Sequence, residues 1–136
     1  MSAVKTFVDT NTLVYAFTAD EPQKQDAALK ALDACLPVIS TQVIKEFSNV
    51  LFKKTNLGPQ GIKEIIIQII GVADIINEET GLILSAFDIH KEYQYSFYDS
   101  LTIASAIKAR CQVLLSEDMQ NGQVIGGKLT IVNPFH

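Results

Sequence analysis

Short runs of apolar, β-prone residues alternate along this sequence with longer segments whose apolar residues recur at helical spacing. Parallel strands need a crossover between them, so this alternation predicts a parallel sheet covered on both faces, in a three-layer α/β/α sandwich. The two clearest strands are 6–8 and 113–115, and the weaker ones are 38–39, 74–76 and 129–132. The expected helices are approximately 23–34, 41–55, 59–71, 78–93 and 98–109.

The chain is expected to form one domain over residues 1–136. Its 48% hydrophobic and 19% charged residues suffice for a core of its own, and no repeat or linker divides it. Residues 1–5 lack the apolar stretch of a signal peptide, and charged and polar residues interrupt the longest apolar region, 62–76. A soluble, cytoplasmic protein with no membrane association is therefore predicted.

The charged and chemically reactive residues exclude several classes of protein. A net charge of -4 gives no overall attraction to nucleic acid, and Arg110 is the only arginine. The only histidines, His90 and His136, are too few for a histidine-rich zinc site or a histidine-based triad. Cys35 and Cys111 fit no metal or redox spacing and are interpreted as reduced core residues. No glycine-rich phosphate loop follows a strand.

Four carboxylates remain as candidates for chemistry. Asp9 and Asp118 follow the two most apolar strands, where open parallel sheets form their ligand crevices. Glu46 borders the buried arc of helix 41–55, and Asp99 shares a helical face with Ile103, so it is expected to point toward the sheet. The alternative interpretation is that the aspartates cap helices or turns and that Glu46 is solvated.

A pocket shared by these carboxylates requires compensation. Two carboxylates 4 Å apart repel by roughly 4 kcal/mol at an effective dielectric constant near 20. They must therefore bind protons or a cation, and oxygen ligands alone select Mg²⁺ or Mn²⁺. Such ions retain water and bind phosphate, which favours hydrolysis of a phosphodiester by a metal-activated water.

Several motifs, in this order and spacing, resemble the PIN-domain nucleases, and most closely the VapC-type toxin ribonucleases of toxin–antitoxin systems. The likeness covers essentially the whole chain. Its pieces are Phe7-Val8-Asp9-Thr10-Asn11, Ser40 with Val43 and Glu46, Tyr98-Asp99-Ser100-Leu101 with Ala104 and Ala106, Leu114-Leu115-Ser116-Glu117-Asp118, and the closing segment 129–135.

The resemblance implies a five-stranded parallel sheet and a Mg²⁺- or Mn²⁺-dependent endoribonuclease that leaves a 5′-phosphate and a 3′-hydroxyl. It also implies a homodimer and an antitoxin peptide across the amino-terminal helices, next to the broad isoleucine face of helix 59–71. Many relatives carry a further acidic residue or histidine after the last aspartate, where Asn121 stands here. The implied metal site consists of Asp9, Glu46, Asp99 and Asp118, supported by Thr10, Asn11 and Ser116.

Local contacts must hold RNA, because the protein is acidic. Lys53 and Lys54 follow Glu46 along its helix and are the first candidates for phosphate contact. Aromatic residues precede Asp99 and are able to stack on an unpaired base, although at least two of the three are expected to pack in the core. These aromatic residues are Tyr95, Phe97 and Tyr98, and further basic candidates are Lys45, Lys108 and Arg110.

Three alternative functions remain open from the sequence. A haloacid-dehalogenase-like phosphatase also opens with a strand ending in Asp, but it needs a second Asp where Asn11 stands. A receiver-type signalling domain needs a phospho-accepting Asp near mid-chain, and residues 52–61 contain no carboxylate. The third alternative is a PIN fold retained only for binding.

Overall fold

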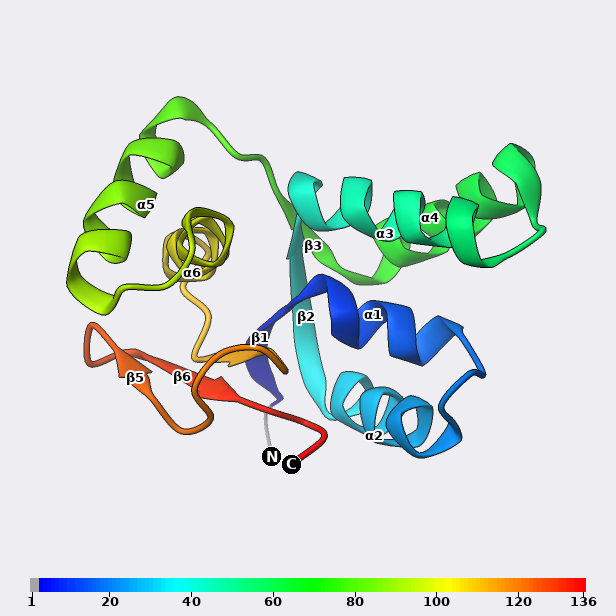
Figure 1. The fold of residues 1–136 in the computed structure, drawn as a ribbon, viewed down its shortest axis with the longest axis horizontal. Coiled ribbons are helices and arrows are strands. Elements are labelled where there is room, and N and C mark those ends of the chain that lie inside the picture. Colours follow the sequence, from blue (N-terminus) through cyan, green and yellow to red (C-terminus); the bar gives the residue numbers. More distant parts are fainter. Residues whose placement is uncertain (1–2) are drawn as a thin grey trace.

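The computed structural model describes residues 3–136, which form one mixed α/β unit around a central sheet (Figure 1). The sheet has six strands in the order β3-β2-β1-β4-β6-β5. None of the helices in this part of the chain is long and apolar enough to cross a membrane. The strands are β1 (Val4–Val8), β2 (Cys35–Ser40), β3 (Asp74–Ile76), β4 (Val113–Leu115), β5 (Val124–Ile125) and β6 (Leu129–Val132).

Five of the strands are parallel and correspond to the five predicted ones. The sixth, β5, was not predicted and pairs antiparallel with β6. It is only two residues long, too short to show an alternating pattern. The turn that joins it to β6 contains Gly126 and Gly127 at φ of +60° and +70°, a conformation that glycine adopts without steric cost.

The helices form two layers. Figure 1 shows α1 to α4 on one side of β1–β3, and α5 with α6 on the other. The predicted α/β/α sandwich is confirmed, and its core is built on both faces of the sheet around fully buried residues such as Phe7, Phe47 and Leu114. The helices are α1 (Thr10–Phe17), α2 (Pro22–Asp33), α3 (Thr41–Lys54), α4 (Gly58–Val72), α5 (Thr80–Tyr93) and α6 (Phe97–Lys108).

Helix α1 was missed by the sequence analysis. It has only eight residues, and its apolar residues, 13–17, form one uninterrupted run with no helical spacing. Asp9 separates β1 from α1, because its carboxylate accepts a hydrogen bond from the backbone N–H of Thr10 and caps the helix. The capping interpretation of Asp9 is therefore correct, and it does not prevent the residue from facing a pocket.

Helix α4 buries less of its isoleucine face than the periodicity predicted. Ile62 and Ile69 are buried, whereas Ile67, Ile70 and Val72 are exposed. This leaves an apolar surface beside α2 and β2. Cys35 and Cys111 are both free thiols, as predicted. Cys111 is part of the core, whereas Cys35 is half-buried and lines a surface pocket, so its assignment to the core was wrong.

The order in which strands are added to the sheet changes direction at β1. It proceeds from β1 to β2 and β3 on one side, and then returns through α5 and α6 to β4 on the other side of β1. The carboxyl ends of β1 and β4 thus flank a topological switch point, where open α/β sheets form a crevice.

Candidate acidic site at the carboxyl end of the sheet

A pocket of about 260 Å³ lies at this switch point. It brings together all four carboxylates that the sequence singled out, from the start of α1, the middle of α3, the first turn of α6 and the loop after β4. The lining residues are Asp9, Thr10, Asn11, Gln42, Glu46, Val50, Tyr98, Asp99, Thr102 and Asp118.

Helix caps determine where two of the carboxylates lie. The side chain of Ser40 accepts from the N–H of Val43 and starts α3, which carries Glu46. The side chain of Ser96 accepts from the N–H of Asp99 at the start of α6. Because Ser96 is the cap, the Asp99 carboxylate is not needed for capping and borders the pocket instead.

Two of the predicted supporting residues hold carboxylates in place. The Thr10 hydroxyl donates to Oε1 of Glu46 over 3.1 Å, and Nδ2 of Asn11 donates to Oδ2 of Asp118 over 3.1 Å. The third, Ser116, is fully buried and does not line the pocket. Its hydroxyl has no hydrogen-bond partner within residues 3–136.

The pKa of Asp9 reflects the negative charge gathered in the pocket. The pKa of Asp9 is raised to about 6, mainly by burial. The hydrogen bond from the backbone N–H of Thr10 lowers this pKa in part, and the charges of Asp99, Glu46 and Asp118 raise it. The pKa of Asp99 is also raised, by burial and by Asp118, against the opposing hydrogen bond to Ser96. The site therefore concentrates negative charge that the protein itself does not neutralise.

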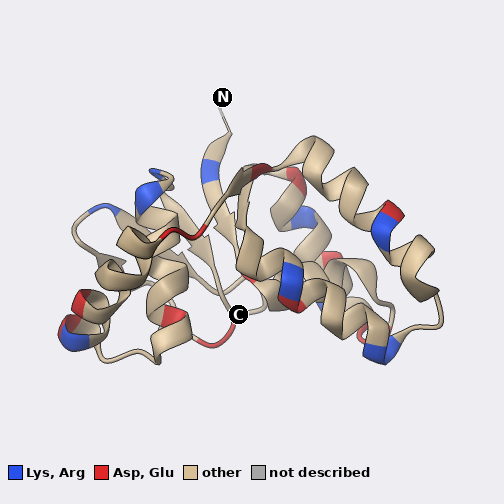
Figure 2. Ribbon diagram, turned by 90° about the horizontal axis from the view of Figure 1, so that it is seen from above, with Lys and Arg blue, Asp and Glu red and all other residues tan. Residues whose placement is uncertain are grey.

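The basic candidates lie outside the pocket. No Lys or Arg is among the pocket-lining residues of the described chain. Lys53 and Lys54 are exposed in the last turn of α3, so the helical rise puts Lys53 about 10 Å beyond Glu46. Lys108 lines a different pocket, beside β3 and α5. Figure 2 shows the basic residues scattered over the molecule without a continuous stripe.

The carboxylates are more widely spaced than in a closed metal site. Between residues 3 and 136, no three His, Cys, Asp or Glu side chains are close enough together to hold a metal ion. The chemistry of the donors nonetheless fits a hard divalent cation, since the pocket offers carboxylate, hydroxyl and amide oxygens and neither imidazole nor thiolate.

Sequence analysis missed Glu78, which lies beside the site. Its Oε1 accepts a hydrogen bond from the backbone N–H of Gln42 over 2.9 Å in the first turn of α3. Burial raises the pKa of Glu78, as does the charge of Glu46, while the Gln42 hydrogen bond and Lys45 lower it. No local pattern could have revealed this contact, because the two partners are 36 residues apart.

A second missed group anchors the loop that carries Asp118. Lys24 of α2 forms a 2.7 Å ion pair with Glu117 and donates to the Tyr15 hydroxyl, which itself donates to Glu117. The hydrogen bond to Glu117 is the main reason that the pKa of Lys24 is raised. The rings of Tyr15 and Phe135 meet edge to face below the ammonium group, 4.9 Å apart. This cluster joins α1 and α2 to the loop after β4.

Replacing Lys24 by Met is therefore expected to lower the melting temperature and to speed amide hydrogen exchange at 116–118. The methionine keeps the apolar stem but removes the charge that Glu117 and two aromatic rings contact. Lys30→Met on the same helix is the matched control, because its ion pair with Asp26 is largely exposed. Equal exchange rates at 116–118 in both variants would contradict an anchoring role for Lys24.

The family model described as the PIN domain matches residues 6–121. The chain therefore belongs to the PIN-domain family. No curated protein sequence matches it. Among solved structures, it is similar to a toxin–antitoxin complex from Klebsiella pneumoniae, at 21% identity over 95% of this chain and 97% of that chain, with a TM-score of 0.71.

Two further solved structures have the same fold. VapC20 of Mycobacterium tuberculosis, described as a sarcin-ricin loop cleaving toxin, is 19% identical, with 83% of this chain and 91% of that chain covered and a TM-score of 0.66. VapBC2 of Rickettsia felis, bound to a DNA fragment from its promoter, is 15% identical, with 95% and 99% covered and a TM-score of 0.66.

Proposed function

We propose that this protein is a Mg²⁺- or Mn²⁺-dependent endoribonuclease and the toxin of a toxin–antitoxin pair, acting in the cytoplasm as a homodimer. The observation that carries the proposal is the convergence of Asp9, Glu46, Asp99 and Asp118 on one pocket at the switch point of the sheet. Membership of the PIN-domain family supports it. So does the fold of a toxin described as cleaving the sarcin-ricin loop.

In this proposal Asp9 and Asp99 are the principal ligands of the ion, and Glu46 and Asp118 complete its surroundings. The ion, when bound, supplies positive charge that lowers the pKa of water and stabilises the charge developing on the phosphate. Among the described residues, no Lys or Arg lines the pocket, so no basic side chain there could stabilise the charge on the phosphate in place of the ion.

In this proposal the protein's own residues hold the carboxylates in place and remove a proton from the attacking water. Thr10 holds Glu46, and Asn11 holds Asp118, each through one hydrogen bond. One of these two carboxylates accepts a proton of the attacking water, whose oxygen forms a bond to phosphorus as the scissile P–O3′ bond breaks. The departing O3′ takes a proton from solvent, which leaves a 5′-phosphate and a 3′-hydroxyl. The side-chain hydrogen bonds keep both carboxylates at the pocket before RNA arrives.

The test is cleavage of a panel of single-stranded and hairpin RNAs by the purified protein, with Mn²⁺, with Mg²⁺ and with a chelator. Cleavage that requires the ion and yields 5′-phosphorylated products is the expected result. Hydrolysis of small phosphomonoesters without cleavage of any RNA would overturn the proposal in favour of a phosphatase.

The antitoxin is proposed to occupy an apolar groove that shares no lining residue with the acidic pocket. A pocket of about 480 Å³ lies between α1, α2, β2 and α4, and most of its lining residues are apolar. Among these lining residues, Leu29, Leu36 and Val72 are exposed. Exposed apolar surface of this extent is typical of a binding site for a partner helix or peptide.

Leu36→Glu, in this groove, is expected to prevent co-purification with the proposed antitoxin when the two proteins are co-expressed, because it puts a charge where an apolar side chain must bind. RNA cleavage by the isolated variant is expected to stay within about twofold of the wild-type rate, since Leu36 is 56% exposed, lies at the amino end of β2 and does not line the acidic pocket. Co-purification in wild-type yield would show that the groove is not the contact.

A further inference from the structure

Tyr98 differs from the other tyrosines of this protein. The chain has four tyrosines, and Tyr15, Tyr93 and Tyr95 each form hydrogen bonds through their hydroxyl groups. The Tyr98 hydroxyl, by contrast, forms no side-chain hydrogen bond within residues 3–136, and the residue is 63% exposed. It lies one residue before Asp99 and lines the same pocket as the four carboxylates. Its ring is thus presented to whatever enters the pocket.

The ring is held by a short aromatic ladder. Tyr98 meets Phe97 edge to face, with ring centroids 5.7 Å apart and planes at 74°. Phe97 is half-buried against the α5–α6 core and lies 5.2 Å from Phe87. An aromatic side chain supported in this way loses little conformational freedom when a flat partner binds to its open surface.

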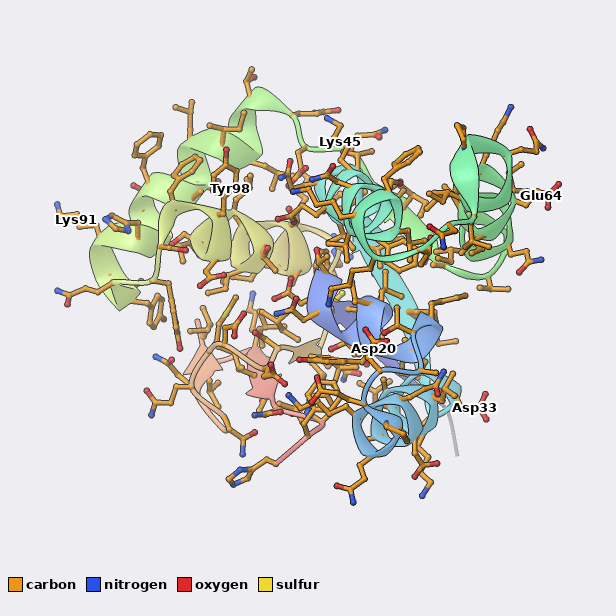
Figure 3. All side chains as sticks on the ribbon, turned by 45° about the vertical axis from the view of Figure 1, so that its right-hand side comes forward. Asp20, Asp33, Lys45, Glu64, Lys91 and Tyr98 are labelled. Carbon is orange, nitrogen blue, oxygen red and sulfur yellow. The ribbon has the colours of Figure 1, made fainter. Side chains whose placement is uncertain are left out.

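The charge of the pocket makes such a contact useful. Phosphate neutralisation is the usual source of affinity for RNA, but four carboxylates and no Lys or Arg line this pocket in the described chain. Stacking of a base on an aromatic ring does not depend on charge. Figure 3 labels Tyr98 on α6 and Lys45 on α3, the two helices that supply Asp99 and Glu46 to the pocket.

We propose that Tyr98, supported by Phe97, stacks on an unpaired base of the RNA strand whose backbone crosses the acidic pocket. The proposal rests on the nuclease function proposed above. It adds a substrate contact on α6, and it leaves phosphate contacts to lysines of α3. A base in a duplex is already stacked on both faces, so this contact selects unpaired RNA.

The test measures binding of a labelled single-stranded RNA, in chelator so that nothing is cleaved, to the wild type and to Tyr98→Ala, Tyr98→Phe and Tyr98→Trp. The alanine variant is expected to bind about tenfold more weakly, and the two aromatic variants within about threefold of the wild type. The same RNA is then made with one abasic position at a time. At one position the loss of the base and the loss of the ring should not add, because each removes the same stack.

Phe52→Ala is the matched control, since Phe52 is a 52% exposed aromatic residue of α3 that does not line the pocket. It should bind RNA like the wild type. If the wild type cleaves RNA but Tyr98→Ala binds the intact RNA as tightly as the wild type does, the stacking contact is refuted and the nuclease function stands. If sedimentation shows that Tyr98→Ala converts a dimer to a monomer while its RNA affinity stays unchanged, the stacking contact is likewise refuted, and Tyr98 lies at a subunit interface. Failure of the wild type to bind or cleave any RNA would refute both.

Discussion

Asp9→Asn is expected to abolish metal-dependent RNA cleavage, with a loss of about 10³-fold or more. The substitution removes the charge of the most buried of the four carboxylates while keeping nearly the same shape. Asn retains an Oδ1 that accepts from the N–H of Thr10, so α1 keeps its cap. Loss of cleavage in this variant therefore reports on charge and ligation in the pocket, and not on unfolding.

Asp99→Asn should cause a loss of the same order, because it removes the second principal ligand proposed for the ion. Asp20→Asn is the control, since this aspartate is exposed in the loop between α1 and α2 and forms no ion pair in the part of the chain that the structure describes. The measurements are single-turnover cleavage rates with Mn²⁺ and circular dichroism of each variant. Full activity of either pocket variant would disprove the assigned metal site.

Asp9→Asn is also expected to stabilise the metal-free protein. The pKa of Asp9 is about 6 in the folded protein and ordinarily 3.8, so folding disfavours the ionised carboxylate. This cost to stability is complete above about pH 7, declines as the pH falls through 6, and vanishes below 3.8. The full shift corresponds to at most about 3 kcal/mol, and water at this partly exposed side chain reduces the expected gain to about 1–3 kcal/mol at pH 7.5.

Thermal unfolding in chelator from pH 4 to 8 measures this effect. The Asp9→Asn variant should melt roughly 5–10 °C above the wild type at pH 7.5 and nearly with it at pH 4. Added Mn²⁺ should raise the melting temperature of the wild type more than that of the variant, because the ion binds the folded state through the ionised carboxylate. A difference between the two proteins that is independent of pH would exclude the charge of Asp9 as its cause.

The sequence was informative where local pattern and position in the fold coincide. Asp9 and Asp118 follow apolar runs, and Asp99 shares a face with residues that became core, so their positions beside the sheet could be predicted from periodicity alone. Periodicity failed where an element was very short. Strand β5 has two residues, and α1 has eight, of which the apolar ones, 13–17, are consecutive and show no helical spacing.

Helical periodicity placed Lys53 on the same side of α3 as Glu46 but did not give its distance from the acidic pocket. A residue two turns beyond Glu46 shares its side of the helix, and the rise of those turns carries the ammonium group away from the pocket. Glu78 is the opposite case. It contacts the start of α3 only because β3 pairs with β2, and no local sequence pattern indicates which strands pair.

Taken alone, the amino-acid sequence determined which kinds of side chain were available: oxygen donors in excess, almost no imidazole and a single guanidinium group. It also determined the alternation that favours a layered α/β fold, since both properties depend on composition and on neighbours a few residues apart. Only the tertiary structure decided that residues 9, 46, 99 and 118 meet, and that Tyr98, not Tyr95 or Phe97, faces them. The reason is that strand order and helix docking, which join segments up to 109 residues apart in position, depend on packing over the whole chain.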